Sequence, residues 1–177
     1  MDNCKTFERN MIISHVHNKK ICVDATCGNG NDTLFLSEIF EKVYAFDIQK
    51  QAIENTKNLC KDKQNIDYIL DSHANIDQYV DRIDCAVFNL GYLPKGNKEI
   101  TTKADTTIEA IKKTMKLLSK TGIISIMVYE GHCEGAREAE KLKEELPKIN
   151  QKEFDIVKYE FVNQINSPPY LYLIQKR

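Results

Sequence analysis

The chain has 177 residues, of which 42% are hydrophobic and 29% charged, and its formal net charge is −1. This length is enough for one domain with a full core, spanning residues 1–177, and is short for two. The near-zero charge argues against general nucleic-acid binding through a uniformly basic surface. No apolar run approaches the about 18 residues of a membrane-spanning helix, and the N-terminal MDNCKTFERN lacks the apolar core of a signal peptide. We therefore expect a cytoplasmic protein that is neither secreted nor membrane-spanning.

The cysteines give little information about function. Six are present, and none forms a Cys-x-x-Cys pair. Cys22 and Cys85 lie within apolar runs that are typical of strands. This pattern indicates thiols in a reducing compartment rather than a disulfide framework or a zinc site. We expect no bound metal.

Apolar runs and helically periodic segments alternate along the chain, without a repeat or a low-complexity tract. A short helix is predicted first, over residues 4–17. The predicted strands that follow span residues 20–25, 42–47, 66–70, 83–90 and 122–128. The predicted helices between and after them span residues 31–40, 49–62, 74–80, 104–119 and 134–146.

Strands that alternate with helices require right-handed crossovers and a parallel sheet. Two further strands, over residues 153–162 and 170–176, are joined only by NQINSPP, which leaves no room for a helix. We expect them to form an antiparallel hairpin at the sheet edge. The predicted fold is therefore α/β and Rossmann-like, with a seven-stranded, mostly parallel sheet, an antiparallel last strand and helices on both faces.

Residues 21–36 are the most informative stretch. An apolar strand runs into a turn containing Gly28 and Gly30, a helix starts directly afterwards, and the next strand ends at Asp47. This order is typical of α/β proteins that bind a ribose-bearing cofactor, because the turn lets backbone approach the ligand and the carboxylate accepts from the ribose hydroxyls. A tight turn with no ligand is the plainer alternative.

Two cofactors compete for this turn. A dinucleotide fingerprint needs a third glycine at position 33, where this chain has Thr33. Polar side chains in the turn, and an acid before it, suit a cationic methionine-like ligand better than a diphosphate. The spacing therefore favours S-adenosylmethionine, and seven strands with a reversed last strand are also the layout of class I methyltransferases. The predicted cofactor contacts here are Asp24, Thr26, Cys27, Gly28, Asn29, Gly30, Asn31, Asp32 and Thr33.

The next two strands add further candidates, because ligands of open α/β sheets bind beyond the C-terminal ends of the strands. The second strand is followed by Ile48 and Gln49, which join Asp47 as predicted cofactor contacts. The third strand delivers Asp71-Ser72-His73, where we expect the adenine amino group. Asp71-Ser72 equally suits an N-cap for the helix predicted over residues 74–80.

The fourth strand ends in FNLGYLP, which loosely resembles the Asn/Asp-Pro-Pro-Tyr segment of amine-directed methyltransferases. Methyl transfer from a sulfonium is an in-line displacement, so the amine lone pair must be held about 3 Å from the methyl carbon. The Asn89 oxygen and a strand-end carbonyl can accept the two amine N–H bonds, and Tyr92 can stack on a flat base. Asn89 and Tyr92 are the predicted catalytic residues, and Asn89, Leu90 and Gly91 are also predicted cofactor contacts. A buried strand that ends in an asparagine turn is the structural alternative.

The substrate contacts are predicted from the loop after the fourth strand and from the end of the fifth. They are Tyr92, Leu93, Pro94, Lys95, Lys98, Tyr129 and His132. Lysines outnumber acids between residues 95 and 120, which could attract phosphate. A solvated helix face accounts for the same lysines equally well.

Several segments together resemble the small YtqB-type rRNA methylase family, whose members are called MnmM. The segments that carry this resemblance are VDATCGNGNDTLFL, FDIQ, DSHANI, FNLGYLPKGNK, YEGHCEG and NSPPYLYLIQK. The resemblance extends from about His15 to Lys176. It implies a class I S-adenosylmethionine-dependent enzyme that methylates the 5-aminomethyl group of 5-aminomethyl-2-thiouridine at the tRNA wobble position, with the anticodon stem-loop as its partner. Cys27 stands where alanine is expected and Glu130 where the family often has proline.

Two other functions stay open from the residues alone. One is methylation of another RNA or of a small-molecule amine, and the other is a cofactor-binding or RNA-binding module without catalysis. A primary amine is mostly protonated at neutral pH, and the sequence contains no unambiguous base to free its lone pair. The sequence also leaves open which tRNAs are used and whether the chain forms a homodimer.

Overall fold

The computed structural model describes residues 1–91, 102–131 and 133–177 of the chain. A strand-and-helix alternation runs through these residues, as the apolar periodicity predicts. The strands are β1 (Ile21–Asp24), β2 (Lys42–Asp47), β3 (Ile66–Leu70), β4 (Ile83–Asn89), β5 (Leu118–Val128), β6 (Phe154–Tyr159) and β7 (Tyr170–Lys176). The helices are α1 (Cys4–His15), α2 (Asn31–Ser37), α3 (Lys50–Leu59), α4 (Ala104–Leu117) and α5 (Cys133–Glu145), with the short 3₁₀ helices η1 (His73–Gln78) and η2 (Leu146–Lys148).

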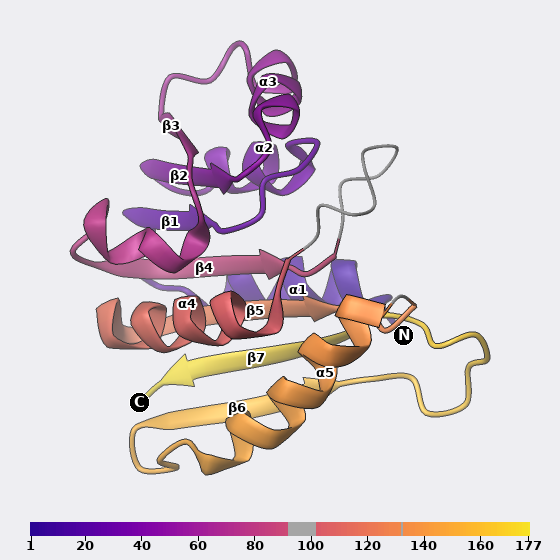
Figure 1. Ribbon diagram of the computed structural model, residues 1–177. Coiled ribbons are helices and arrows are strands. Elements are labelled where there is room, and N and C mark those ends of the chain that lie inside the picture. The colour runs from indigo at the N-terminus through magenta and orange to yellow at the C-terminus, as the bar shows by residue number, and fades with distance from the viewer. Residues whose placement is uncertain (92–101, 132) are drawn as a thin grey trace.

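The seven strands form one sheet in the order β3-β2-β1-β4-β5-β7-β6 (Figure 1). β1 to β5 pair in parallel, and β7 is antiparallel to both of its neighbours, β5 and β6. The predicted fold class is confirmed, including the closing hairpin at the sheet edge. β7 inserts between β5 and β6, so that β6 is the edge strand.

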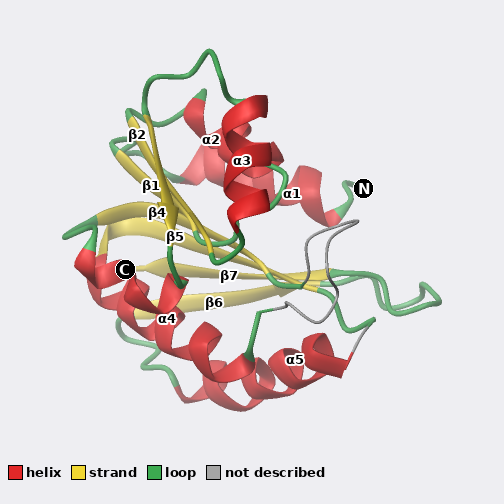
Figure 2. Ribbon diagram, turned by 45° about the horizontal axis from the view of Figure 1, so that its top comes forward, coloured by secondary structure: helices red, strands yellow, loops and turns green. Residues whose placement is uncertain are grey.

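Helices cover both faces of the sheet (Figure 2). α1, α2 and α3 lie against one face, where Ile12, Leu36 and Ile53 belong to one buried apolar cluster. α4 and α5 lie against the other, where Ile111 and Leu142 belong to a second cluster. The sheet thus separates two cores, which explains why its central strands are apolar on both sides.

Several predicted boundaries differ from the structure, and α1, α2 and α3 each end two or three residues before the predicted end. The predicted helix over 74–80 is the 3₁₀ helix η1, whose φ/ψ angles leave the helical region at Asn75. The strand predicted from residue 122 begins at Leu118, directly after α4, and its pairing with β4 is irregular between Ile83 and Cys85. The strand predicted over 153–162 is the shorter β6.

The sheet order reverses direction between β1 and β4, at the centre of the sheet. The chain leaves β1 toward β2 on one side, whereas it leaves β4 toward β5 on the other. The C-terminal ends of β1 and β4 therefore flank the topological switch point, where open α/β sheets bind their ligands. Within the described residues, no helix is both long and apolar enough to cross a membrane.

Candidate functional site

The turn between β1 and α2 lies across the ends of two other strands. The Ala25 N–H donates to the Val87 carbonyl of β4, and the Cys27 N–H donates to the Phe46 carbonyl of β2, both at 2.8 Å. A third bond of 2.8 Å, from the Gly30 N–H to the Cys27 carbonyl, closes the turn itself. The backbone of the turn is therefore fixed by its neighbours before any ligand binds.

Both glycines of the turn have positive φ angles, 53° at Gly28 and 86° at Gly30. A Cβ atom on Gly30 would lie 2.9 Å from the Cα of Thr56 in α3. The Thr56 hydroxyl also donates to the Gly28 carbonyl at 3.2 Å. The sequence pattern predicts close approach of backbone to a ligand, whereas the structure shows that Gly30 allows close approach to α3.

Asp24, at the end of β1, lies beneath the turn with no exposed surface. Its carboxylate accepts from the Thr33 hydroxyl at 2.6 Å and from the Thr26 N–H at 3.2 Å. Burial, followed by the negative charge of Asp32, raises the pKa of Asp24 to about 7. Asp24 thus holds the turn from below, and its contact with the cofactor stays a prediction.

This raised pKa predicts a pH dependence of stability. A carboxyl group whose pKa is higher in the folded than in the unfolded state binds its proton more tightly when the protein is folded. Its contribution to the free energy of unfolding therefore falls as the pH rises from about 4 to about 7. We expect Asp24→Asn to gain about 1–3 kcal/mol of stability relative to wild type over this interval. The uncharged amide can still accept from the Thr26 N–H through its oxygen and can donate to the Thr33 hydroxyl through its nitrogen. Urea unfolding at a series of pH values measures this difference. The exposed Asp81→Asn is the matched control, and equal slopes for Asp24→Asn and wild type would contradict the prediction.

Asp47, at the end of β2, binds the same turn from the side. Its two oxygens accept from the Gly28 N–H at 3.0 Å and from the Gln49 N–H at 2.9 Å. Burial raises the pKa of Asp47, although these backbone bonds oppose the shift. Beside it Ile48 is 56% exposed, an apolar side chain at the rim of the turn.

The end of β3 provides a cap and a buried imidazole. The Ser72 hydroxyl accepts from the Ala74 N–H at 3.2 Å and caps η1, as the structural alternative predicts. The Asp71 carboxylate accepts from the Ser72 N–H at 2.7 Å and from the Tyr79 hydroxyl at 2.8 Å. Both side chains therefore have structural roles at this strand end.

His73 is the better candidate contact at this position. Its Nδ1 lies 3.2 Å from the Ala25 carbonyl at the end of β1, and because a carbonyl only accepts, Nδ1 carries the proton. Burial lowers the pKa of His73, so the ring is neutral at physiological pH. Nε2 is then a buried acceptor with no hydrogen-bond partner among the described residues. An amino group that donates a hydrogen bond, such as that of adenine, fits this atom.

The remaining residues of the turn and the start of α2 differ in their exposure and in their contacts. The Asn29 side chain accepts from Asn55 Nδ2 of α3 at 2.9 Å. Asn31 is exposed at the start of α2, whereas Cys27 and Thr33 are buried. Asn55, like Thr56, is a site residue that sequence reasoning missed.

Asn89 ends β4 next to this turn. Its backbone N–H donates to the Thr26 hydroxyl at 2.7 Å, and its Nδ2 donates to Asp32 Oδ2 at 3.2 Å. The structure thus brings together three of the predicted residues, from the ends of β1 and β4 and the start of α2. Leu90 follows as a buried residue whose N–H donates to the Met127 carbonyl of β5 at 3.0 Å.

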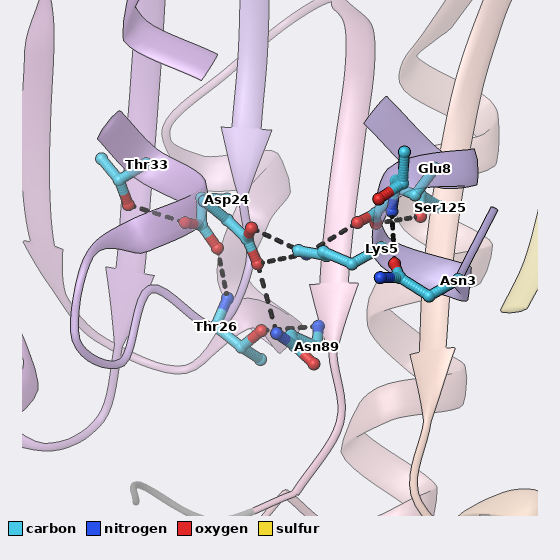
Figure 3. Close-up of polar contacts among 10 residues, drawn as sticks. Asn3, Lys5, Glu8, Asp24, Thr26, Thr33, Asn89 and Ser125 are labelled. Carbon is cyan, nitrogen blue, oxygen red and sulfur yellow. Dashed lines mark hydrogen bonds and ion pairs between the residues drawn. The ribbon is translucent and has the colours of Figure 1, made fainter. Parts of the chain in front are cut away.

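Two residues of α1 complete this cluster, although sequence reasoning treated the helix only as a lead-in. Lys5 Nζ lies 2.7 Å from Asp32 Oδ1 and 2.6 Å from Glu8 Oε2 (Figure 3). Glu8 accepts in turn from the Ser125 hydroxyl of β5. Burial raises the pKa of Glu8, with Lys5 opposing the shift. The only local sequence signal is the spacing of Lys5 and Glu8, which places the two on one face of a helix.

The predicted substrate contacts are placed only in part. Tyr129 follows β5 and is 38% exposed, and partial burial raises the pKa of its phenol. Gly91 pairs with Thr102 through N–H···Oγ1, at 3.0 Å, and through a backbone bond of 3.1 Å from the Thr102 N–H. The residues that lie outside the described parts of the chain are Tyr92, Leu93, Pro94, Lys95, Lys98 and His132.

Comparison with known proteins gives both sequence and structural relatives. The family model described as "Putative rRNA methylase" matches residues 43–175. The curated protein "tRNA (mnm(5)s(2)U34)-methyltransferase, chloroplastic" of Arabidopsis thaliana is 34% identical over 171 residues. That alignment covers 87% of this chain and 62% of the Arabidopsis protein, so the chain spans less than two thirds of this relative's length.

Two solved structures are similar over nearly their whole length. A "putative rRNA-methylase" from Clostridium thermocellum is 40% identical with a TM-score of 0.96, covering 100% of this chain and 99% of the other. SMU.1697c from Streptococcus mutans, described as "a putative methyltransferase" and solved in complex with SAH, is 38% identical with a TM-score of 0.93 and the same coverage. These chains share the class I methyltransferase fold described above. Since the family model also matches most of the sequence, the chain belongs to the family described as "Putative rRNA methylase".

Proposed function

We propose that the chain is an S-adenosylmethionine-dependent tRNA methyltransferase. The acceptor is the 5-aminomethyl nitrogen of wobble 5-aminomethyl-2-thiouridine in the anticodon stem-loop, and the product is 5-methylaminomethyl-2-thiouridine. The name of the Arabidopsis relative supports this acceptor, as does the resemblance to the YtqB-type family. The single observation that carries the proposal is the position of Asn89, at the end of β4 and directly beside the β1–α2 turn.

The described residues fit S-adenosylmethionine. His73 Nε2 is an unpartnered acceptor suited to an adenine amino group, and Ile48 is an exposed apolar side chain suited to the adenine ring. The Asp47 carboxylate, at the end of β2, is suited to the ribose hydroxyls. The complex of the Streptococcus mutans relative with SAH also supports this cofactor.

The charges near Asn89 suit a cationic ligand. Asp24, Asp32 and Glu8 lie in one buried network with a single lysine, Lys5. A sulfonium group is favoured beside such a cluster of acidic side chains. When bound, S-adenosylmethionine supplies an activated methyl group for in-line transfer.

Asn89 then has a specific task in this reaction. An amide oxygen accepts a hydrogen bond from the amine and so orients the remaining lone pair toward the methyl carbon. The roles of Tyr92, Lys95 and Lys98 in holding the tRNA remain predictions from the sequence.

Nucleoside mass spectrometry tests the proposed reaction. The purified protein is incubated with S-adenosylmethionine and tRNA that carries 5-aminomethyl-2-thiouridine, and the tRNA is then digested. We expect this nucleoside to be replaced by its 5-methylaminomethyl form. Methylation of a different RNA nucleoside or of a small amine would assign another acceptor, and cofactor binding without any product would favour a non-catalytic module.

The cofactor assignment leads to a prediction for Asp47. We expect Asp47→Ala to weaken S-adenosylmethionine binding about tenfold or more, because losing a hydrogen bond to a charged group costs about 1.5–3 kcal/mol. Calorimetric titration measures the affinity, and thermal unfolding shows whether the fold is kept. Asp67→Ala, which removes an exposed carboxylate paired with Lys42, is the matched control. Unchanged affinity in Asp47→Ala would remove this residue from the site, and tight NADH binding by the wild type would overturn the cofactor itself.

A further inference from the structure

The orientation of the Asn89 side chain is set by its neighbour Asp32. Asn89 Nδ2 lies 3.2 Å from Asp32 Oδ2. A carboxylate can only accept hydrogen bonds, so the nitrogen of the amide must face Asp32 and its oxygen must point elsewhere. In residues 1–91, 102–131 and 133–177, Asn89 Oδ1 has no hydrogen-bond partner.

Asp32 is itself held in place by Lys5. Lys5 Nζ lies 2.7 Å from each of the two Asp32 oxygens, and Asp32 is only 9% exposed. Burial lowers the pKa of Lys5, but the charges of Glu8 and Asp32 outweigh this effect and hold it above its ordinary value. The lysine is therefore charged at physiological pH, and it forms an ion pair with the carboxylate that faces Asn89.

The lysine is anchored to the rest of the fold at the first turn of α1. The Asn3 side chain caps this turn by accepting from the Thr6 N–H at 2.8 Å. Glu8 binds both Lys5 and Ser125, which ties α1 to β5 (Figure 3). A continuous chain of hydrogen bonds thus leads from β5 through α1 and α2 to the side chain at the end of β4.

We propose that Asp32 and Lys5 are positioning residues that fix the Asn89 amide with its oxygen toward the reacting nucleophile. The site would then favour a nucleophile that donates a hydrogen bond, such as a primary amine, over one that only accepts. This inference deepens the proposed function and rests on it for the identity of the acceptor. The orientation of Asn89 itself depends only on the protein.

Hydrogen exchange of the Asn89 side-chain amide, followed by NMR in the cofactor-free protein, tests the orientation without any substrate. We expect Asp32→Asn to speed this exchange about tenfold or more, the change that corresponds to the loss of a charged hydrogen bond. Lys5→Met should act in the same direction. Lys148→Met, which removes exposed ion pairs to Glu144 and Glu145, is the matched control and should have no effect. Equal exchange in wild type and Asp32→Asn would overturn the proposal.

A double-mutant cycle tests the effect on turnover. On tRNA carrying 5-aminomethyl-2-thiouridine, and at saturating S-adenosylmethionine, we expect Asp32→Asn to lower kcat about tenfold or more. In an Asn89→Ala background the same substitution should have no further effect on kcat, because Asp32 acts through Asn89. An undiminished loss in that background would overturn the positioning role. If the wild type does not methylate this tRNA while the exchange effect is present, the proposed function fails and the orienting contact stands.

Discussion

Asn89→Ala should lower single-turnover methylation of tRNA carrying 5-aminomethyl-2-thiouridine by about 100-fold, while cofactor affinity changes far less. In the proposed reaction the amide oxygen of Asn89 accepts from the amine and orients it, and misplacement of a reacting group by one ångström can cost about 100-fold. The backbone N–H of Asn89, which donates to Thr26, is kept in the variant, so the turn beside the cofactor should stay in place. Rapid-quench kinetics with excess enzyme measures the chemical step directly.

Asn89→Asp is the sharper variant. It keeps an acceptor oxygen but places a second carboxylate next to Asp32, which lies 3.2 Å from the wild-type amide nitrogen. The added charge stabilises the ammonium form of the acceptor and so keeps its lone pair protonated. We expect the activity of this variant to recover as the pH rises, whereas Asn89→Ala stays slow at every pH.

Asn150→Ala provides the control for both variants. Asn150 lies between η2 and β6, and among the described residues its side chain binds only its neighbours Lys152 and Glu153. Its substitution should leave the rate of methylation unchanged. A near-wild-type single-turnover rate for Asn89→Ala would show that this asparagine only ends the strand. The search for the group that holds the amine would then move to Tyr129 and His132.

The fold could be predicted because its signals are local. Each strand is a short apolar run and each helix a periodic segment, so the order of elements followed from the sequence. The errors lie where tertiary structure determines the bounds or the type of an element. α4 passes into β5 at Leu118 without a turn, and the polar Ser119 and Lys120 follow. The strand therefore could not be recognised before the apolar residues from 122 onward. At η1 the short segment before Val80 holds a 3₁₀ rather than an α-helical conformation.

The site could be predicted at the level of strand ends but not of side-chain partners. Chain order alone identifies which residues follow β1, β2 and β4, and parallel strands place those residues at one edge. Chain order does not show that Lys5, which lies 27 residues before Asp32, reaches it across the interface of α1 and α2. The carboxylates of the turn therefore have partners within the chain that no local pattern could indicate.

The glycine at position 30 could likewise be recognised from the sequence, but its packing against α3 could not. This packing leads to a second large expected effect. Gly30→Ala should lower the free energy of unfolding by about 2–4 kcal/mol, the sum of a strained positive φ angle and an overpacked contact. The φ angle is 86°, and the nearest atom to the added Cβ is the Thr56 Cα at 2.9 Å, followed by Thr56 Cγ2 at 3.1 Å. Backbone atoms cannot rotate away as the end of a side chain can, so α3 must move.

Urea unfolding measures this loss, with Gly131→Ala as the matched control because a Cβ there meets no atom of the described residues within 4 Å. Thr56→Ser removes Cγ2 but leaves the Cα, so in combination with Gly30→Ala it should restore only a small part of the lost stability. Full rescue would show that the glycine is needed only to accommodate the threonine methyl group. We expect Gly30→Ala to weaken cofactor binding as well, because a shift of α3 displaces Thr56 and Asn55, which hold Gly28 and Asn29 of the turn. Normal affinity for S-adenosylmethionine in a destabilised Gly30→Ala protein would separate the packing of this turn from its binding role.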